Sequence, residues 1–151
     1  MRYVKSLLVL LGFAATMFAA DPFVGTWKMN SAKSKFKMGA APKEQTVTIG
    51  ESGSDLTVNV MGTAADGSAI AYSYTVPAAG GVGKINSASY DGISGKRPGP
   101  KEREMTYTKG GKEVFTTHSK VSADGKSLTV TSKGLNVIGK NVEGSITYDK
   151  K

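Results

Sequence analysis

The chain has 151 residues and no cysteine, and its 20 Lys and Arg against 12 Asp and Glu give a formal net charge of +8. The lack of cysteine excludes disulfides and thiolate metal ligands. The positive charge is compatible with weak attraction to an anionic envelope surface. No nucleic-acid-binding motif accompanies it, so we expect no nucleic-acid partner.

Residues 1–20 have the pattern of a signal peptide. Arg2 and Lys5 precede an uncharged, mostly apolar run from Leu7 to Ala20, which is shorter than the roughly 20 residues that span a membrane. Cleavage after Ala20 would leave residues 21–151 as a single domain without a transmembrane segment. We therefore expect an exported protein, periplasmic or extracellular, with an uncleaved membrane anchor as the alternative.

From Phe23 onward, apolar residues recur at every second position, for example in Leu56–Val60 and Ile70–Val76. The positions between them carry mostly Thr, Ser, Lys and Asn, a pattern typical of strands with one solvated face. Short turn motifs with Gly-Gly or Asp-Gly separate the strands. The pattern predicts an all-β domain, an antiparallel up-and-down meander of about eight or nine strands.

Two segments depart from the alternation. Asn30–Lys43 begins with residue types that cap helices, and we expect one short helical turn there before Pro42. Asp91–Glu102 is rich in Gly and Pro and is predicted to be a mobile loop. Closing the meander as a barrel would remove its exposed edges, whereas a two-sheet sandwich would need longer connections.

Gly25 and Trp27 lie in the first predicted strand. An inward Trp can plug one end of a barrel, and a Gly beside it lets another side chain or backbone segment approach closely. We interpret both residues as a structural plug of the barrel.

The segment FVGTWKMN (Phe23–Asn30) resembles the Gly-x-Trp opening of the lipocalins and fatty-acid-binding proteins, the calycin barrels. The ending SITYDKK (Ser145–Lys151) is similar to the last strand of the fatty-acid-binding proteins. Nearly all of residues 21–151 also resembles secreted bacterial proteins of uncharacterised function called lipocalin-like, which share KSKF (Lys33–Phe36) and a hairpin of the type DGKSLTVTSKG (Asp124–Gly134). The resemblance implies a lipocalin-like or fatty-acid-binding-protein-like barrel.

Two cations of these families are missing from their usual positions. Fatty-acid-binding proteins hold a carboxylate with an Arg two residues before the terminal Tyr, but here Tyr148 is preceded at that position by Ile146. Lipocalins pack an Arg near the last strand over the Trp, and no Arg occurs in that part of this chain. The resemblance therefore supports the barrel and argues against a classical fatty-acid site.

Catalytic groups are sparse in this sequence. His118 is the only His, and the alternation places it on the outward face of its strand, without a partner for nucleophilic or metal chemistry. We expect no enzyme activity, no metal and no cofactor.

The interpretation that unites these features is a barrel that binds a small apolar or amphipathic ligand in its interior. The candidate lining residues, which a filled core would use equally well, are Ile70, Tyr72, Tyr74, Tyr107, Phe115 and Tyr148. A filled barrel acting as an envelope-associated interaction or inhibitor module is the alternative. Two basic clusters are interpreted as solvated surface charge, with a rim that attracts an anionic ligand or envelope surface as the alternative: Lys33, Lys35 and Lys37, and Lys96, Arg97, Lys101 and Arg103.

Overall fold

The computed structural model describes residues 19–151, so the predicted signal peptide lies almost entirely outside the described residues. Within this range the chain is all strand and turn, and none of it forms a helix that could span a membrane. The strands are β1 (Gly25–Met38), β2 (Glu44–Ser52), β3 (Asp55–Thr63), β4 (Ala69–Pro77), β5 (Gly81–Val82), β6 (Lys84–Asn86), β7 (Gly92–Gly99), β8 (Glu102–Lys109), β9 (Lys112–Val121), β10 (Ser127–Leu135) and β11 (Asn141–Lys150).

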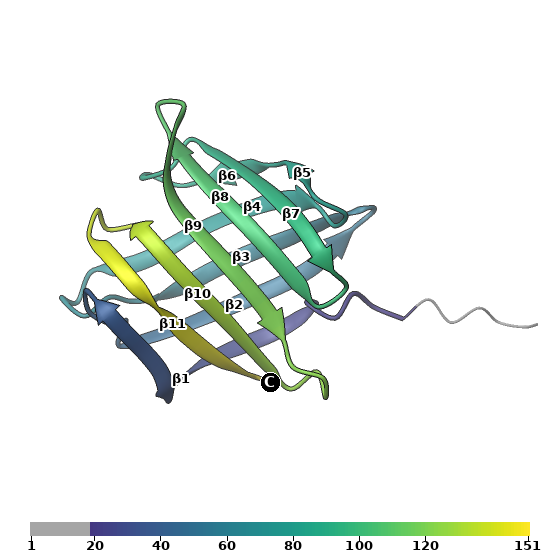
Figure 1. Ribbon diagram of the computed structural model, residues 1–151, viewed down its shortest axis with the longest axis horizontal. Helices are drawn as coiled ribbons and strands as arrows, with labels where there is room; N and C mark the ends of the chain where they lie inside the picture. The colour runs from purple at the N-terminus through teal and green to yellow at the C-terminus, as the bar shows by residue number, and fades with distance from the viewer. Residues whose placement is uncertain (1–18) are drawn as a thin grey trace, which may run out of the picture.

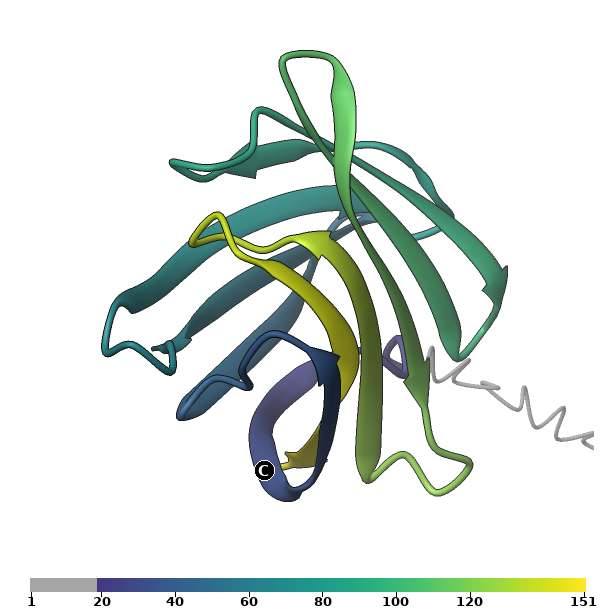
Figure 2. The ribbon, with the colours of Figure 1, turned by 60° about the vertical axis from the view of Figure 1, so that its left-hand side comes forward.

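All the described strands belong to one antiparallel sheet in the order β5-β7-β8-β9-β10-β11-β1-β2-β3-β4-β6. The sheet curls on itself, so that β7–β10 pass in front of β2–β4 (Figures 1 and 2). The predicted fold class, an antiparallel meander curled into a barrel, is confirmed. The predicted number of strands was too low, because the short β5 and β6 contribute only two and three residues, too few to show an alternation.

The two short strands close the barrel. β5 pairs with β7, and β6 pairs with β4, although β5 and β6 are separated only by Gly83. The N–H of Gly83 donates to the carbonyl of Ile93 at 2.9 Å. One extended segment, residues 81–86, therefore changes partner at Gly83 and joins the two ends of the sheet.

The predicted helical turn in Asn30–Lys43 is wrong, because β1 continues to Met38. The pairing of β1 with β11 shifts between Asn30 and Lys35, so the strand carries extra residues and bends sharply there. Within the bend, the hydroxyl of Ser34 donates to the carbonyl of Asn30 at 2.8 Å and accepts from the N–H of Thr147 at 3.2 Å. The polar side chains that suggested a helix cap instead satisfy the backbone of a bulged strand.

The predicted mobile loop at Asp91–Glu102 is also wrong, because most of it is β7, paired with β8. Gly95 lies against a large β8 side chain, because a Cβ added there would approach the sulfur of Met105 to 3.1 Å. A residue without a side chain is suited to such a position. Glycine here indicates close cross-strand packing rather than mobility.

Because the barrel closes where residues 81–86 change partner, we expect Gly83→Ala to lower the free energy of unfolding by about 1–3 kcal/mol. A Cβ at this position would lie 2.3 Å from the backbone oxygen of Thr75, so the backbone itself would have to move. Gly99→Ala is the matched control, because a Cβ at Gly99 meets nothing within 4 Å. Urea unfolding of both variants tests this, and equal stabilities would refute the role of Gly83 in closure.

Candidate functional site

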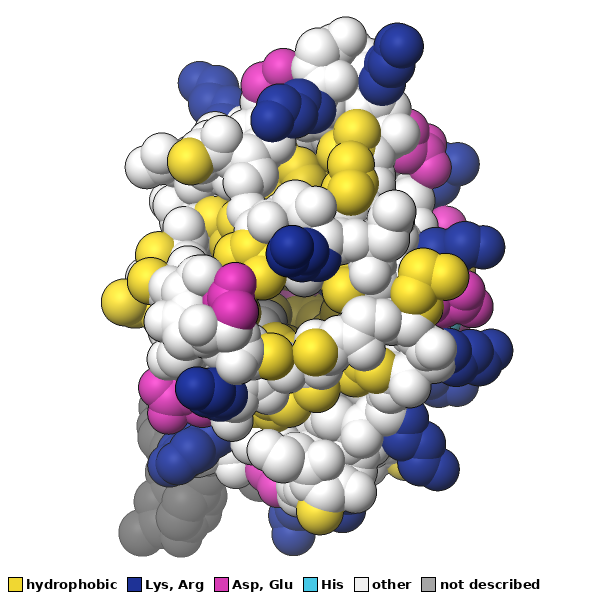
Figure 3. All heavy atoms as spheres, turned by 90° about the vertical axis from the view of Figure 1, so that its left-hand side faces the viewer, with side chains coloured by type: hydrophobic (Ala, Val, Ile, Leu, Met, Phe, Trp, Pro, Cys, Tyr) yellow, Lys and Arg dark blue, Asp and Glu magenta, His cyan; other side chains and the backbone are white. Residues whose placement is uncertain are grey.

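The barrel encloses a cavity of about 400 Å³. Its mouth lies among three connections between strands. Pro42 belongs to the connection of β1 and β2, Asp66 to that of β3 and β4, and residues 136–140 form the turn between β10 and β11. Figure 3 looks toward this end of the molecule and shows a hollow bordered by hydrophobic side chains. The interior is therefore not completely filled by its own side chains.

The six predicted lining residues are all on the wall of this cavity. They come from β4, β8, β9 and β11 and include four of the tyrosines: Ile70, Tyr72, Tyr74, Tyr107, Phe115 and Tyr148. The alternation of the strands thus identified the inward face correctly. Their contact with a ligand stays a prediction.

Aromatic rings form a cluster on one side of the interior. Tyr107 lies 5.0 Å from Tyr90 and 5.3 Å from Phe115 between ring centroids, and Tyr72 meets Tyr107 edge-on at 6.4 Å. Burial raises the pKa of Tyr72, of Tyr90 and of Tyr107, so these hydroxyls stay neutral and can donate hydrogen bonds. The cluster combines apolar surface with a few polar atoms.

Tyr90 was not predicted from the sequence. It belongs to the connection between β6 and β7, and its side chain lines the cavity. Its hydroxyl donates to the carbonyl of Leu135 at 2.8 Å and ties this connection to the end of β10. Tyr90 lies outside any strand, so no alternation marks its direction. The only signal in the sequence is an aromatic residue within a run of Ser, Asn, Asp and Gly.

Tyr148 is buried at the position that resembles the terminal Tyr of the fatty-acid-binding proteins. Its hydroxyl accepts a hydrogen bond of 2.9 Å from the side-chain amide of Gln45. Ile146 also lines the cavity. Gln45 and Ile146 therefore contribute a neutral amide and an aliphatic side chain to this part of the wall, neither of which carries a charge.

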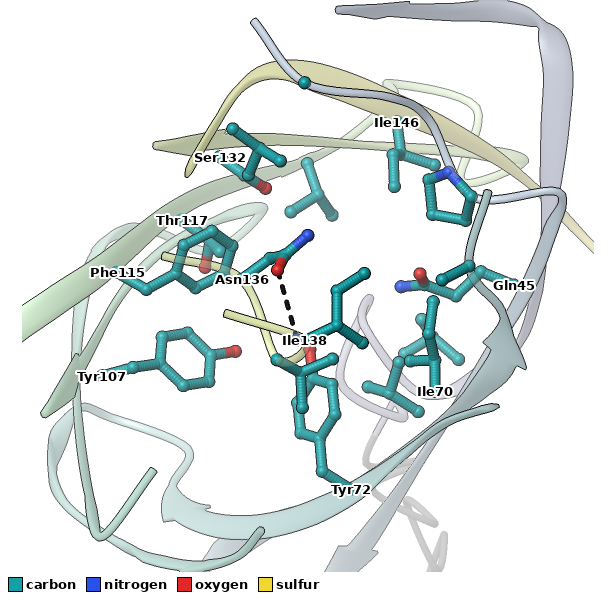
Figure 4. Close-up of a pocket in the computed structure, with 18 of the residues that line it drawn as sticks. Gln45, Ile70, Tyr72, Tyr107, Phe115, Thr117, Ser132, Asn136, Ile138 and Ile146 are labelled. Carbon is teal, nitrogen blue, oxygen red and sulfur yellow. Dashed lines mark hydrogen bonds between the residues drawn. The ribbon is translucent and has the colours of Figure 1, made fainter. Parts of the chain in front are cut away.

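The cavity wall differs in polarity around its circumference. On β2, β3 and the start of β4 the lining is aliphatic except for Gln45, with Val47, Ile49, Val58, Val60 and Ile70. On β8, β9 and β10 the lining mixes polar and apolar side chains, and the polar members besides Tyr107 are Arg103, Thr117, Ser119 and Ser132. Figure 4 shows Thr117, Ser132 and Asn136 across the cavity from Ile70.

Trp27 is completely buried at the closed end of the barrel, and its indole N–H donates to the carbonyl of Phe23 at 2.9 Å. Phe23, rather than Trp27, lines the cavity. The ammonium of Lys150 lies 5.3 Å from the centre of the Trp27 ring. A Cβ at Gly25 would come within 2.8 Å of the Lys150 side chain, so Gly25 makes room for the cation that covers the Trp.

Arg97 and Arg103 correct the interpretation of the second basic cluster as solvated surface charge. Arg97 forms two hydrogen bonds with the carboxylate of Asp21, at 2.5 and 3.0 Å, and Arg103 is only 5% exposed. Their guanidinium groups lie 5.5 and 5.3 Å from the centre of the Phe23 ring. Both side chains point inward because the period-two alternation acts on charged residues as it does on apolar ones.

Asp21 is bound tightly at this closed end. Burial by itself would raise the pKa of its carboxyl group, but hydrogen bonds from Arg97 and from the N–H of Phe23 outweigh burial. The pKa is lowered, and the group is ionised near neutral pH. The Asp21–Arg97 pair therefore joins the N-terminal residues of the domain to β7.

His118 lies beside Glu102, with 3.4 Å between its Nε2 and the carboxylate, and its side chain is 42% exposed. The outward direction predicted for it agrees with this position. Within residues 19–151, no group of three or more His, Asp or Glu side chains is arranged to hold a metal ion.

No protein-family model matches this chain, and no curated protein sequence matches it. Among solved structures, the chain is similar to zebrafish ileal bile acid-binding protein in complex with cholic acid, at 15% sequence identity and a TM-score of 0.48. The similarity covers 86% of this chain and 99% of that chain.

Because the pKa of Asp21 is lowered on folding, its contribution to stability is present above about pH 4, the usual pKa of an unfolded Asp, and is lost as the pH falls through the folded pKa. We expect Asp21→Asn to lower the free energy of unfolding at neutral pH by about 1.5–3 kcal/mol, since it breaks a charged pair. Its stability should also fall less steeply than that of the wild type below about pH 4.

Glu104→Gln is the matched control for this variant, because it removes one carboxylate from an exposed position on β8. Denaturant unfolding at several pH values measures the difference. If Asp21→Asn and Glu104→Gln lost equal stability at neutral pH, the Asp21–Arg97 pair would not stabilise the closed end.

Proposed function

We propose that this protein binds one small amphipathic molecule inside its barrel. A cavity of about 400 Å³ falls within the range of small-molecule sites, roughly 300–1,000 Å³. The observation that carries the proposal is the uneven polarity of the wall, which apart from Gln45 is aliphatic on β2, β3 and the start of β4 and is partly polar on β8–β10. A molecule with one apolar and one polar part is complementary to such a wall.

Burial of the ligand would supply most of the affinity. Removing about 200 Å² of apolar surface from water contributes about 5 kcal/mol, from which the loss of the ligand's translational and rotational freedom must be subtracted. The hydroxyls of the wall would then orient the polar part of the ligand. Binding of this kind needs neither a cofactor nor a catalytic group.

We further propose that the protein acts after export, in the periplasm or outside the cell, in keeping with the pattern of residues 1–20 and with the secreted bacterial proteins that the chain resembles. A barrel that acts only through its surface, as an interaction or inhibitor module, would not require an interior cavity. The volume left open inside this one favours ligand binding over that alternative.

Nile red, a neutral dye that fluoresces in apolar surroundings, probes the cavity directly. We expect Ile70→Trp to weaken Nile red binding about tenfold or more, because the larger ring would occupy the volume that the dye needs. Ala71→Trp is the matched control: it introduces the same ring at the next position of β4, which is exposed. Thermal unfolding would confirm that both variants fold.

Equal binding by the two Trp variants would place the dye outside the barrel and refute interior binding. Native mass spectrometry of the protein from its own cell, purified without denaturation, tests the natural situation. We expect an adduct that solvent extraction removes, on a chain that begins at Asp21. A bare chain that acquires nothing from a mixed lipid extract would count against the proposal, and an adduct on an uncleaved chain would count against export.

A further inference from the structure

Arg103 is a buried cation with access to the cavity. It belongs to β8, where Arg103, Met105 and Tyr107 all point inward, and it is 5% exposed while forming part of the cavity wall. Within residues 19–151, no carboxylate forms a salt bridge with it. Its hydrogen bond is to the sulfur of Met105, at 3.4 Å, and sulfur is a weak acceptor.

Asp21 is the acid near Arg103, and it is already paired with Arg97. Arg103 helps to lower the pKa of Asp21, but both carboxylate oxygens of Asp21 are bound by Arg97. The ring of Phe23, with its centre 5.3 Å from the Arg103 guanidinium, attracts a cation without neutralising its charge. Around Phe23, two guanidinium groups therefore lie near one carboxylate, and among the described residues Arg103 has no carboxylate partner of its own.

A buried charge without a counter-ion is unfavourable unless something compensates it. A guanidinium group is always protonated in proteins and cannot escape this cost by losing its proton. Its planar fork of N–H donors matches the two oxygens of a carboxylate. The missing partner of Arg103 is thus best supplied by an anion that enters the cavity.

Hydroxyl groups lie next to Arg103 on the same wall. Ser119 is opposite Arg103 in the register of β8 and β9, and Thr117 is opposite Met105. Directly opposed side chains in an antiparallel pair have Cβ atoms about 4.5–5.5 Å apart. Both hydroxyls line the cavity, so they can donate hydrogen bonds to a carboxylate that Arg103 holds.

We propose that the ligand is an anionic amphiphile with one carboxylate, bound head first, with Arg103 as its charge partner at the closed end. Its apolar part extends along the aliphatic wall toward Pro42 and Ile138 at the mouth. This inference rests on the proposed function and adds the charge and the orientation of the ligand. The cation lies on β8, not at position 146 of β11, where the fatty-acid-binding proteins place their Arg.

Decanoate and decanol test the proposal, because they share one alkyl chain and differ in charge. Isothermal titration calorimetry should show tighter binding of decanoate to the wild type. We expect Arg103→Met to weaken decanoate binding about tenfold or more, the effect of losing a charged hydrogen-bonded pair, while decanol binding changes about twofold or less. Lys140→Met is the matched control, because it removes a cation at the mouth of the same cavity and should leave the preference for decanoate intact.

The outcomes separate the two proposals. If the wild type binds neither compound, interior ligand binding itself is refuted. If it binds decanol at least as tightly as decanoate, or if Arg103→Met weakens both equally, ligand binding stands and the anionic headgroup site is refuted.

A measurement on the wild type keeps the test decisive if Arg103→Met does not fold. The carboxyl group of bound, isotope-labelled decanoate can be titrated by NMR. A cation beside it should hold its pKa below that of the free acid, and contacts of its methyl end should be to Ile138 rather than to Phe23. An unchanged or raised pKa, or the reverse orientation, would overturn the proposal.

Discussion

The rest of this structure depends on one constraint: a single antiparallel sheet closes on itself. The interior that it encloses is larger than the inward side chains can fill. The segment at residues 81–86 pairs with β7 on one side of Gly83 and with β4 on the other, and in this way joins the two ends of the sheet. With no cysteine in the chain, packing and this ring of hydrogen bonds hold the domain together. Closure also makes the inward residues of distant strands face one another across a cavity.

The two ends of the barrel differ in chemistry. Phe23, Trp27 and the Asp21–Arg97 pair seal one end, while the other opens between the connections of the strands (Figure 3). A buried cation at the sealed end and an aliphatic wall leading toward the open end define a direction within the cavity. A ligand with a charged head and an apolar tail fits this arrangement with its head at the sealed end and its tail toward the open end. The proposed function is linked to the fold in this way.

Much of the interior could be predicted from the alternation of residue types. Ile70, Tyr72 and Phe115 line the cavity as predicted, because in a half-buried strand the period of two decides which face a side chain occupies. The same rule, applied to the charged residues, would have placed Arg103 inside with Met105 and Tyr107. It was missed because Arg103 was grouped with neighbouring Lys residues as surface charge. Tyr90 could not be predicted in this way, since it belongs to no strand.

The all-β class, the meander and the inward face of most strands can be read from the residues alone, because they follow from local alternation and turn chemistry. Three features become visible only in the folded chain: the bulged strand within Asn30–Lys43 in place of a helical turn, β7 in place of a loop, and the joining of the two sheet ends at Gly83. Each of these depends on hydrogen bonds to residues distant in the chain. The size of the cavity also depends on the closed barrel, and so does the fact that, within residues 19–151, the acid near Arg103, Asp21, is already bound by Arg97.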